Sequence, residues 1–287
     1  MKPRYFHSLF LLENSREDQM FPMQRIDAPE ILDSDACSPA DVEISMRDIG
    51  RVNRWFGGVA TTQKMVERVA QANRLNRLSL LEVAAGSGEV PEMVRQRLAR
   101  RGIALDATLL DRAGSHLPAR NFSDADLIRR NRSVVADAFA LPFGDGAFDL
   151  VSCCLFAHHL SPQQLAQFVR EGLRVSRRAL LINDLVRHPL HLALAFAGFP
   201  LMRSRVAWLD GLTSVRRAYI PIEIRSTISS AFSSDASSLR PRVEITRHYL
   251  FRMGVIAWKA PTVRTNSCSD TNLTCATATI RPHPPTH

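Results

Sequence analysis

Short apolar runs alternate with segments of helical spacing through the middle of this 287-residue chain. The apolar runs have the length of buried strands, and most gaps between them carry a helical pattern. Strands are expected at 78–83, 105–110, 134–136, 148–155 and 179–182, and helices at 90–101, 125–130 and 163–175. Strands that alternate with helices form a parallel sheet through right-handed crossovers. The pattern therefore predicts a doubly wound α/β domain.

The two ends of the chain differ from this pattern. Residues 1–41 contain four prolines and no sustained periodicity, which indicates an N-terminal arm. Residues 42–77 have helical spacing, interrupted at Gly57-Gly58, which predicts a helical cap over the domain that follows. Residues 261–287 are rich in Thr, Ser and Pro, and such a composition predicts a disordered tail.

The predicted domain spans 78–260 and contains an insertion. Residues 185–235 leave the alternating pattern and are expected to form a lid over the acceptor, including an apolar helix over 189–205. Two strand-like runs at 243–249 and 251–258 are so close in sequence that they predict an antiparallel end to the sheet.

Charge and cysteine content narrow the class of protein. The formal charge is +9, yet the basic residues are nearly all arginines scattered along the chain, so we do not expect a nucleic-acid partner. None of the five cysteines forms a Cys-x-x-Cys pair, which favours reduced thiols in a cytoplasmic protein. The longest apolar stretches are too short for a membrane span.

A glycine loop at the first predicted strand indicates a ligand site. The apolar run reaches Glu82 and then the turn Gly86-Ser87-Gly88, where a helix begins. Glycines allow a ligand close to the backbone, and the helix N-terminus offers unpaired N–H groups. A carboxylate repels a pyrophosphate but suits an amino group, a hydroxyl or a cation. The loop therefore favours a zwitterionic or sulfonium nucleoside over a dinucleotide.

Polar residues follow the other predicted strands as well. Asp111, Asp137, the segment 156–159 and Asn183-Asp184 each come directly after an apolar run. Any one of them is explained as a helix cap or a turn residue. As a series they indicate a binding edge, because ligands of open parallel sheets lie at the carboxyl ends of the strands.

Over residues 78–259, this set of motifs resembles the class I S-adenosylmethionine-dependent methyltransferases, and most closely those that act on quinones, polyketides and other natural products. Their first motif reads acidic-x-Gly-x-Gly-x-Gly, and residues 82–88 match it except that Ala84 replaces the first glycine. Alanine is tolerated there if its φ is negative. The resemblance implies a Rossmann-like, mostly parallel seven-stranded sheet with an antiparallel C-terminal strand. It also implies methyl transfer from S-adenosylmethionine to a small, hydrophobic or aromatic acceptor.

The resemblance also implies the site residues. Asp111 would hold the ribose hydroxyls, and Asp137 with Ala138 beside it would contact the adenine. The full predicted cofactor set is Glu82, Ala84, Gly86, Ser87, Gly88, Asp111, Arg112, Asp137, Ala138 and Cys154.

His158 and His159 are the candidate catalytic residues, because imidazole titrates near neutrality and can take a proton from a hydroxyl. The alternative is that they pack and hydrogen-bond at the strand end. No third cysteine or histidine stands at ligand spacing, so no metal is expected. Among the arginines, Arg187, Arg216 and Arg217 could orient an acidic substrate, or could simply be solvated.

Three other functions compete. A nicotinamide-dependent oxidoreductase would need a glycine where Pro91 stands. A non-catalytic binding protein of the same fold is favoured only by Ala84. A nucleic-acid methyltransferase is suggested by the charge, but the residues after Asn183 lack the Pro-Pro-aromatic sequence that grips a flipped base. The acceptor and the oligomeric state stay open.

Overall fold

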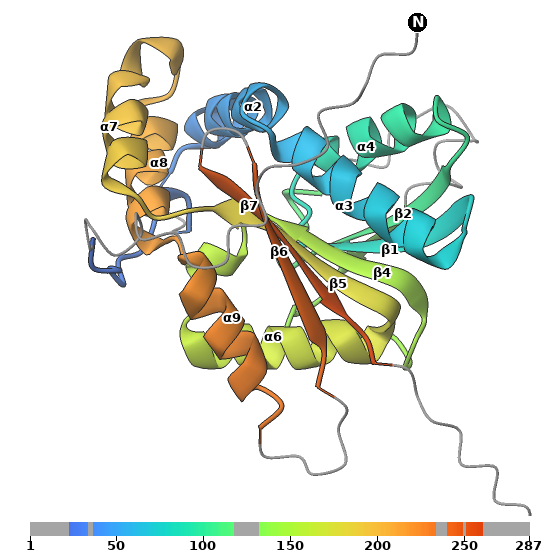
Figure 1. Cartoon of the computed structure of the whole chain (residues 1–287). Helices are drawn as coiled ribbons and strands as arrows, with labels where there is room; N and C mark the ends of the chain where they lie inside the picture. The colour runs from blue at the N-terminus through green and yellow to red at the C-terminus, as the bar shows by residue number, and fades with distance from the viewer. Residues whose placement is uncertain (1–22, 34–36, 118–131, 234–239, 249–250, 261–287) are drawn as a thin grey trace, which may run out of the picture.

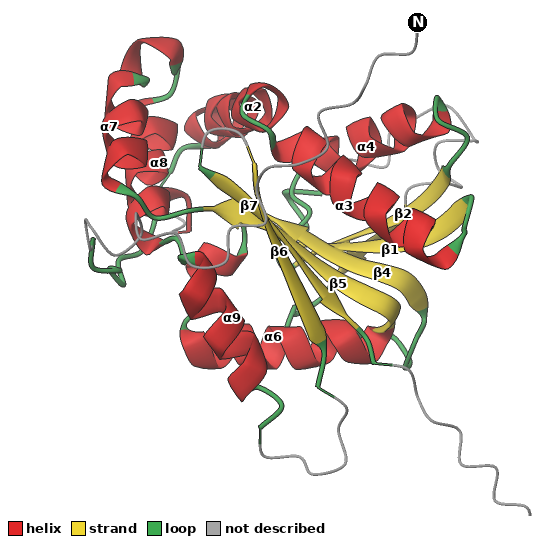
Figure 2. Ribbon diagram, viewed as in Figure 1, coloured by secondary structure: helices red, strands yellow, loops and turns green. Residues whose placement is uncertain are grey.

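The computed structural model describes residues 23–33, 37–117, 132–233, 240–248 and 251–260, and its centre is a seven-stranded sheet (Figures 1 and 2). The strand order is β3-β2-β1-β4-β5-β7-β6. The strands are β1 (Arg77–Val83), β2 (Ala104–Asp111), β3 (Arg132–Val135), β4 (Phe148–Cys154), β5 (Ser176–Leu185), β6 (Arg242–His248) and β7 (Arg252–Trp258). The first five pair in parallel, and β7 runs antiparallel to both β5 and β6. The predicted fold class is confirmed.

Helices cover both faces of the sheet (Figure 1). On one face α3 (Gly58–Asn73) packs against β5 and β7 and α4 (Glu89–Ala99) packs against β2, and on the other α6 (Pro162–Val175) and α9 (Pro221–Ser230) lie next to each other. In α6 the side chains of Leu165, Phe168, Val169 and Leu173 follow the helical repeat and are buried. Two apolar layers therefore enclose the sheet and fix the positions of its strand ends.

The carboxyl edge of the sheet is covered by α2 (Pro39–Trp55), α7 (Pro189–Ala197), the 3-10 turn η3 (Phe199–Leu201) and α8 (Arg205–Arg217). The expectation of one continuous helix over 189–205 was wrong. The helix ends before Gly198, since Pro200 cannot donate the backbone hydrogen bond that a continuing helix needs. After the turn, α8 packs beside α7, and the Trp208 indole donates to the Ala195 carbonyl oxygen at 3.1 Å.

A buried arginine fixes this cover to the sheet. Arg252 is 1% exposed, and its guanidinium donates at 3.1 Å to the side-chain oxygens of Asn183 on β5 and Asn53 on α2. The amide of Asn183 in turn donates at 2.7 Å to the Gly58 carbonyl oxygen and to Thr62. Because these groups are buried, their pairing sets how α2 and α3 sit over the strand ends.

Several predicted segments lie outside the described residues: the helix at 125–130, the tail at 261–287 and most of the arm. The domain boundaries after 41, 77 and 260, and the lid at 185–235, stay predictions. Within the part of the chain that the structure describes, no helix has the length and apolar character that crossing a bilayer requires.

Candidate functional site

A cavity of about 670 Å³ opens at the carboxyl ends of β1, β2 and β4, and its volume is within the usual range of small-molecule sites. Most of the predicted site residues line it: Glu82, Ala84, Gly86, Ser87, Asp111, Arg112, Asp137, Ala138, Cys154 and His159. Two predicted residues do not reach its wall. Gly88 lies behind the loop as the N-cap of α4, and His158 is buried beneath the wall.

The loop between β1 and α4 has an unusual backbone. Gly86 and Gly88 have φ values of 51° and 70°, a region that suits glycine. Ala84 has a φ of 53°, so the condition under which an alanine is tolerated here, a negative φ, is not met. An alanine in the left-handed region costs about 1–2 kcal/mol. Leu155, which also lines the cavity, has a φ of 55°. Strained backbone of this kind is typical of functional sites.

Among the described acidic residues that line the cavity, Glu82 is the most deeply buried. It is 1% exposed, and its carboxyl accepts a hydrogen bond from the Ser152 hydroxyl on β4. Burial raises the pKa of Glu82 to about 7, although the Ser152 hydrogen bond acts in the opposite direction. The carboxyl has room for further donors, so an amino group or hydroxyl of a ligand would stabilise its ionised form.

Asp111, at the end of β2, holds the glycine loop in place. One carboxylate oxygen accepts from the Gly86 backbone N–H at 2.9 Å, and the other accepts from Ala113 at 3.0 Å. Asp137 follows β3 and accepts from the Phe139 N–H at 2.9 Å, which makes a tight turn. Since each carboxylate oxygen can accept more than one hydrogen bond, both acids have capacity left for a ligand.

The two histidines of the turn η2 (Ala157–His159) differ in their surroundings. His158 is 2% exposed, with Nδ1 at 2.7 Å from Asp184 and Nε2 at 3.4 Å from Glu30. Burial alone would lower the pKa of His158, but the carboxylates of Asp184 and Glu30 outweigh it and raise the pKa to about 9. His159 reaches the cavity, and its Nδ1 lies 3.2 Å from Asp33.

The cavity also contains residues that the sequence did not indicate. The N-terminal segment 23–33 runs along the carboxyl edge and brings Glu30, Leu32 and Asp33 to the wall. Its backbone is fixed at Ile31 and Leu32, whose N–H groups donate to the Asp210 carboxylate at 2.7 and 2.9 Å. These contacts join residues almost 180 positions apart in the sequence, so no local sequence motif predicts them.

The three arginines with a possible substrate role have different positions. Arg217 is buried, lines the cavity and donates to the His159 carbonyl oxygen at 3.0 Å. Arg187 pairs with Glu223 at 2.6 Å and is thus bound within the protein. Arg216 is exposed and does not line the cavity.

Comparison with known proteins gives one matching family model, the methyltransferase domain, over residues 81–179. No curated protein sequence matches the chain.

One similar solved structure is the plantazolicin methyltransferase BpumL in complex with a triazolic desmethylPZN analog and SAH. Its TM-score is 0.58 at 12% sequence identity, and the alignment covers 78% of this chain and 92% of BpumL. An O-methyltransferase family 2 protein from Planctomyces limnophilus, in complex with apigenin, has a TM-score of 0.53 and 18% identity, covering 79% and 63%. A putative S-adenosyl-L-methionine-dependent methyltransferase from Methanococcus maripaludis has a TM-score of 0.51 and 14% identity, covering 80% and 99%. At these identities the similarity is one of fold.

The strand order, the glycine loop and the matched domain together define a Rossmann-like methyltransferase. Residues 81–179 carry a methyltransferase domain, and the fold is the one found in class I S-adenosylmethionine-dependent methyltransferases. The chain is a methyltransferase, and S-adenosylmethionine is its cofactor.

Proposed function

We propose that this enzyme methylates a small, hydrophobic or aromatic acceptor in the cavity at the carboxyl edge, with the donor bound over the β1 loop. The observation that carries the proposal is that Glu82 and Asp111, from neighbouring strands, line one cavity together with the left-handed loop between them. Carboxylates at adjacent strand ends match a nucleoside whose polar groups are mostly hydrogen-bond donors.

The donor fits these residues group by group. Glu82 would accept from the amino group of the amino-acid portion, and Asp111 from the two ribose hydroxyls. Asp137 would accept from the adenine amino group, with Ala138 against the ring. The other predicted cofactor residues that line the cavity, Ala84, Gly86, Ser87, Arg112 and Cys154, would complete the donor site, and Gly88 would support the loop from behind.

Bound S-adenosylmethionine supplies a methyl group already activated by positive sulfur. The protein therefore has to align the acceptor and exclude water. Leu32, Met46 and Ile49 add apolar wall next to the polar Glu30 and His159. An acceptor with an apolar body and one polar group would match this end of the cavity. The solved complexes with a plantazolicin analog and with apigenin support an acceptor of that kind.

The two histidines have different roles in this proposal. His159 lies on the cavity wall and would contact the acceptor. His158 has carboxylates near both ring nitrogens, so it would act as a positioning residue rather than as a general base.

The proposed lid is the α7–α8 pair. Phe196, Phe199 and Leu201 are 64%, 49% and 59% exposed, and the pair encloses a second, apolar cavity of about 180 Å³ with α2. Large exposed apolar side chains gathered at one place mark an interaction site more often than a solvated surface. A hydrophobic acceptor entering under this pair would cover part of that surface.

Calorimetry with S-adenosylhomocysteine and NADH, side by side, tests the donor assignment. We expect S-adenosylhomocysteine to bind and NADH not to bind. Asp111→Ala should weaken the affinity for S-adenosylhomocysteine at least tenfold, which corresponds to about 1.4 kcal/mol of binding free energy. The exposed Asp106→Ala, on the opposite end of β2, is the control and should bind normally. Binding of NADH alone would overturn the proposal.

We also propose a cytoplasmic location without a nucleic-acid partner. The free cysteines Cys37, Cys153 and Cys154 in the described part of the chain support a reducing compartment. A steep loss of duplex-DNA or RNA affinity with added salt would contradict the second part, because that slope counts phosphate contacts.

A further inference from the structure

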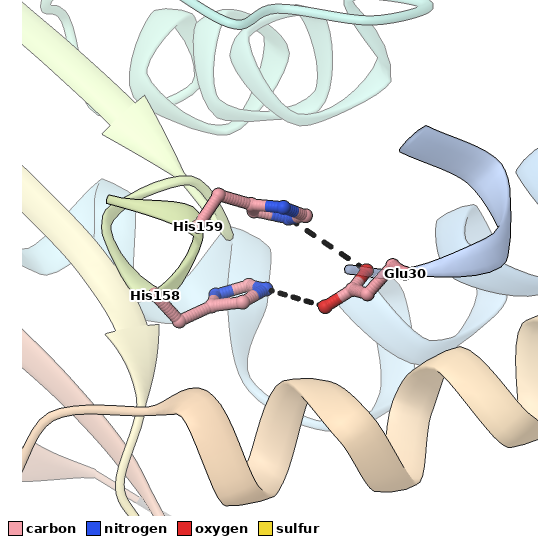
Figure 3. A group of neighbouring side chains, drawn as sticks. All are labelled: Glu30, His158 and His159. Carbon is pink, nitrogen blue, oxygen red and sulfur yellow. Dashed lines mark ion pairs between the residues drawn. The ribbon is translucent and has the colours of Figure 1, made fainter. Parts of the chain in front are cut away.

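Glu30, His158 and His159 bring three potential metal ligands together beside the cavity (Figure 3). One ligand atom from each residue lies within 4.8 Å of the other two. Nε2 of His158 is 3.4 Å from one Glu30 carboxylate oxygen, and Nε2 of His159 is 3.7 Å from the other. In a tetrahedral zinc site, with ligands at about 2.0–2.1 Å, neighbouring ligand atoms stand about 3.3–3.4 Å apart. The cluster is close to that spacing.

The opposite nitrogen of each imidazole meets a carboxylate. Nδ1 of His158 is 2.7 Å from Asp184, and Nδ1 of His159 is 3.2 Å from Asp33. Asp184 is itself fixed, because it accepts from the backbone N–H groups of His158 at 3.0 Å and Leu185 at 2.7 Å. Carboxylates at Nδ1 hold a histidine in the tautomer and orientation that leave Nε2 free to bind a metal. Both histidines have this support, and both Nε2 atoms face Glu30.

Three carboxylates lie beside the two imidazoles. Glu30 and Asp184 are buried next to His158, and Asp33 lies next to His159. A buried carboxylate is costly unless a positive charge or a hydrogen bond compensates it. A metal ion held by both Nε2 atoms would supply that charge next to Glu30, in place of a proton on His158.

We propose that Glu30, His158 and His159 bind a divalent transition-metal ion of the zinc type. Two imidazoles and one carboxylate suit such an ion better than Mg²⁺ or Ca²⁺, which prefer oxygen ligands. Three protein ligands leave a coordination position free. Since Glu30 and His159 line the cavity, that position is open to the cavity rather than to the protein interior.

The role of the ion in methyl transfer rests on the proposed function, whereas the binding of the ion to the protein does not. A cation at the acceptor end would coordinate an oxygen of the acceptor and lower the pKa of a bound hydroxyl. The position of the acceptor would then depend on the ion. Binding of the donor would not, because the proposed donor residues Glu82 and Asp111 lie at the ends of other strands.

The test uses the whole chain, freed of metal with a chelator and then titrated with Zn²⁺ in a calorimeter and with Co²⁺ in an absorption spectrometer. We expect about one ion per chain and the visible bands of a low-symmetry Co²⁺ site. Glu30→Gln and His159→Ala should each weaken binding by more than about tenfold, and Asp33→Asn, behind His159, by about tenfold. His248→Ala changes a histidine bonded to Thr246 on β6 and should bind as the unaltered protein does. Thermal unfolding establishes that each variant is folded.

Absence of stoichiometric Zn²⁺ and Co²⁺ binding would overturn the metal site. So would Glu30→Gln and His159→Ala variants that are folded and bind normally. S-adenosylhomocysteine binding is measured on the metal-free protein in the same series and should be unchanged. If the nucleoside fails to bind while the metal binds, the proposed function falls and the metal site stands.

Discussion

Glu82 offers a prediction whose size follows from its burial. The pKa of its carboxyl is raised by burial from an ordinary 4.5 to about 7 in the folded protein. A shift of about 2.5 units corresponds to ~3 kcal/mol, since each unit is worth 1.36 kcal/mol. Folding therefore favours the protonated acid, and the folded protein binds more protons than the unfolded chain between these two values.

The free energy of unfolding should therefore fall as the pH rises. The stabilising contribution of protonated Glu82 is fully present below pH 4.5 and is lost as the pH rises to and through about 7. Glu82→Gln removes the titration and retains a side chain that can accept from Ser152. From pH 4.5 to 8, the unaltered protein should lose ~3 kcal/mol of unfolding free energy relative to Glu82→Gln. For a chain of this size, that is about 6–12 °C in Tm.

Urea unfolding at several pH values between 4.5 and 8 measures the difference between the two proteins, so that other titrating groups cancel. The exposed Glu43→Gln, whose partner is Arg47 on the same helix, is the matched control and should follow the unaltered protein. Parallel curves for the unaltered protein and Glu82→Gln would show that folding does not raise the pKa of Glu82. Calorimetry near pH 6 in buffers of different ionisation enthalpy adds a ligand test: S-adenosylhomocysteine should displace a proton from Glu82, and the variant should show no such release.

Three further changes test other parts of the site. Ala84→Gly should raise the unfolding free energy by about 1 kcal/mol in urea unfolding, because it relieves a left-handed alanine; a loss of stability would show that the φ of 53° is not strained. Gly88→Ala should lower stability by more than 1 kcal/mol and weaken S-adenosylhomocysteine binding in calorimetry, because the added Cβ would stand 2.5 Å from Leu109 Cδ1; wild-type values would contradict this. Arg252→Met should cost about 3–5 kcal/mol by the same urea assay, since it leaves two buried asparagines without their partner, and a cost under 1 kcal/mol would mean that the pairing is not required.

The fold was predictable because its signals are local. Each parallel strand is a short apolar run buried on both faces, and Leu80 and Leu81 on successive positions of β1 enter opposite layers of the core. The convergence of the proposed donor residues on one cavity was predictable for a related reason. Topology places the residue after each parallel strand at one edge, so Glu82, Asp111 and Asp137 had to converge.

The proposed acceptor half of the cavity was not predictable by such reasoning. Glu30 reaches His158 through a segment without helical or strand periodicity, held by polar contacts to α8 such as Ile31 to Asp210. We expected no metal site because we looked only at the spacing of cysteines and histidines. Glu30 lies 128 positions before His158, so that spacing could not reveal it. The break at Gly198 was missed because the apolar residues on both sides read as one helix.

The two halves of the site are therefore fixed by different forces. The proposed donor residues stand on strands whose positions are set by apolar layers, so their geometry persists as long as the core is packed. The residues proposed to meet the acceptor depend on hydrogen bonds of the N-terminal segment, for example from Arg25 to the carbonyl oxygens of Arg217 and Leu160. Each such bond is worth only about 0.5–1.5 kcal/mol net, so the segment can detach without global unfolding. Removal of these bonds by Arg25→Met should thus disturb the group around Glu30 while S-adenosylhomocysteine still binds. If the variant disturbed the group around Glu30 and weakened S-adenosylhomocysteine binding to the same extent, the two halves would form one cooperative unit.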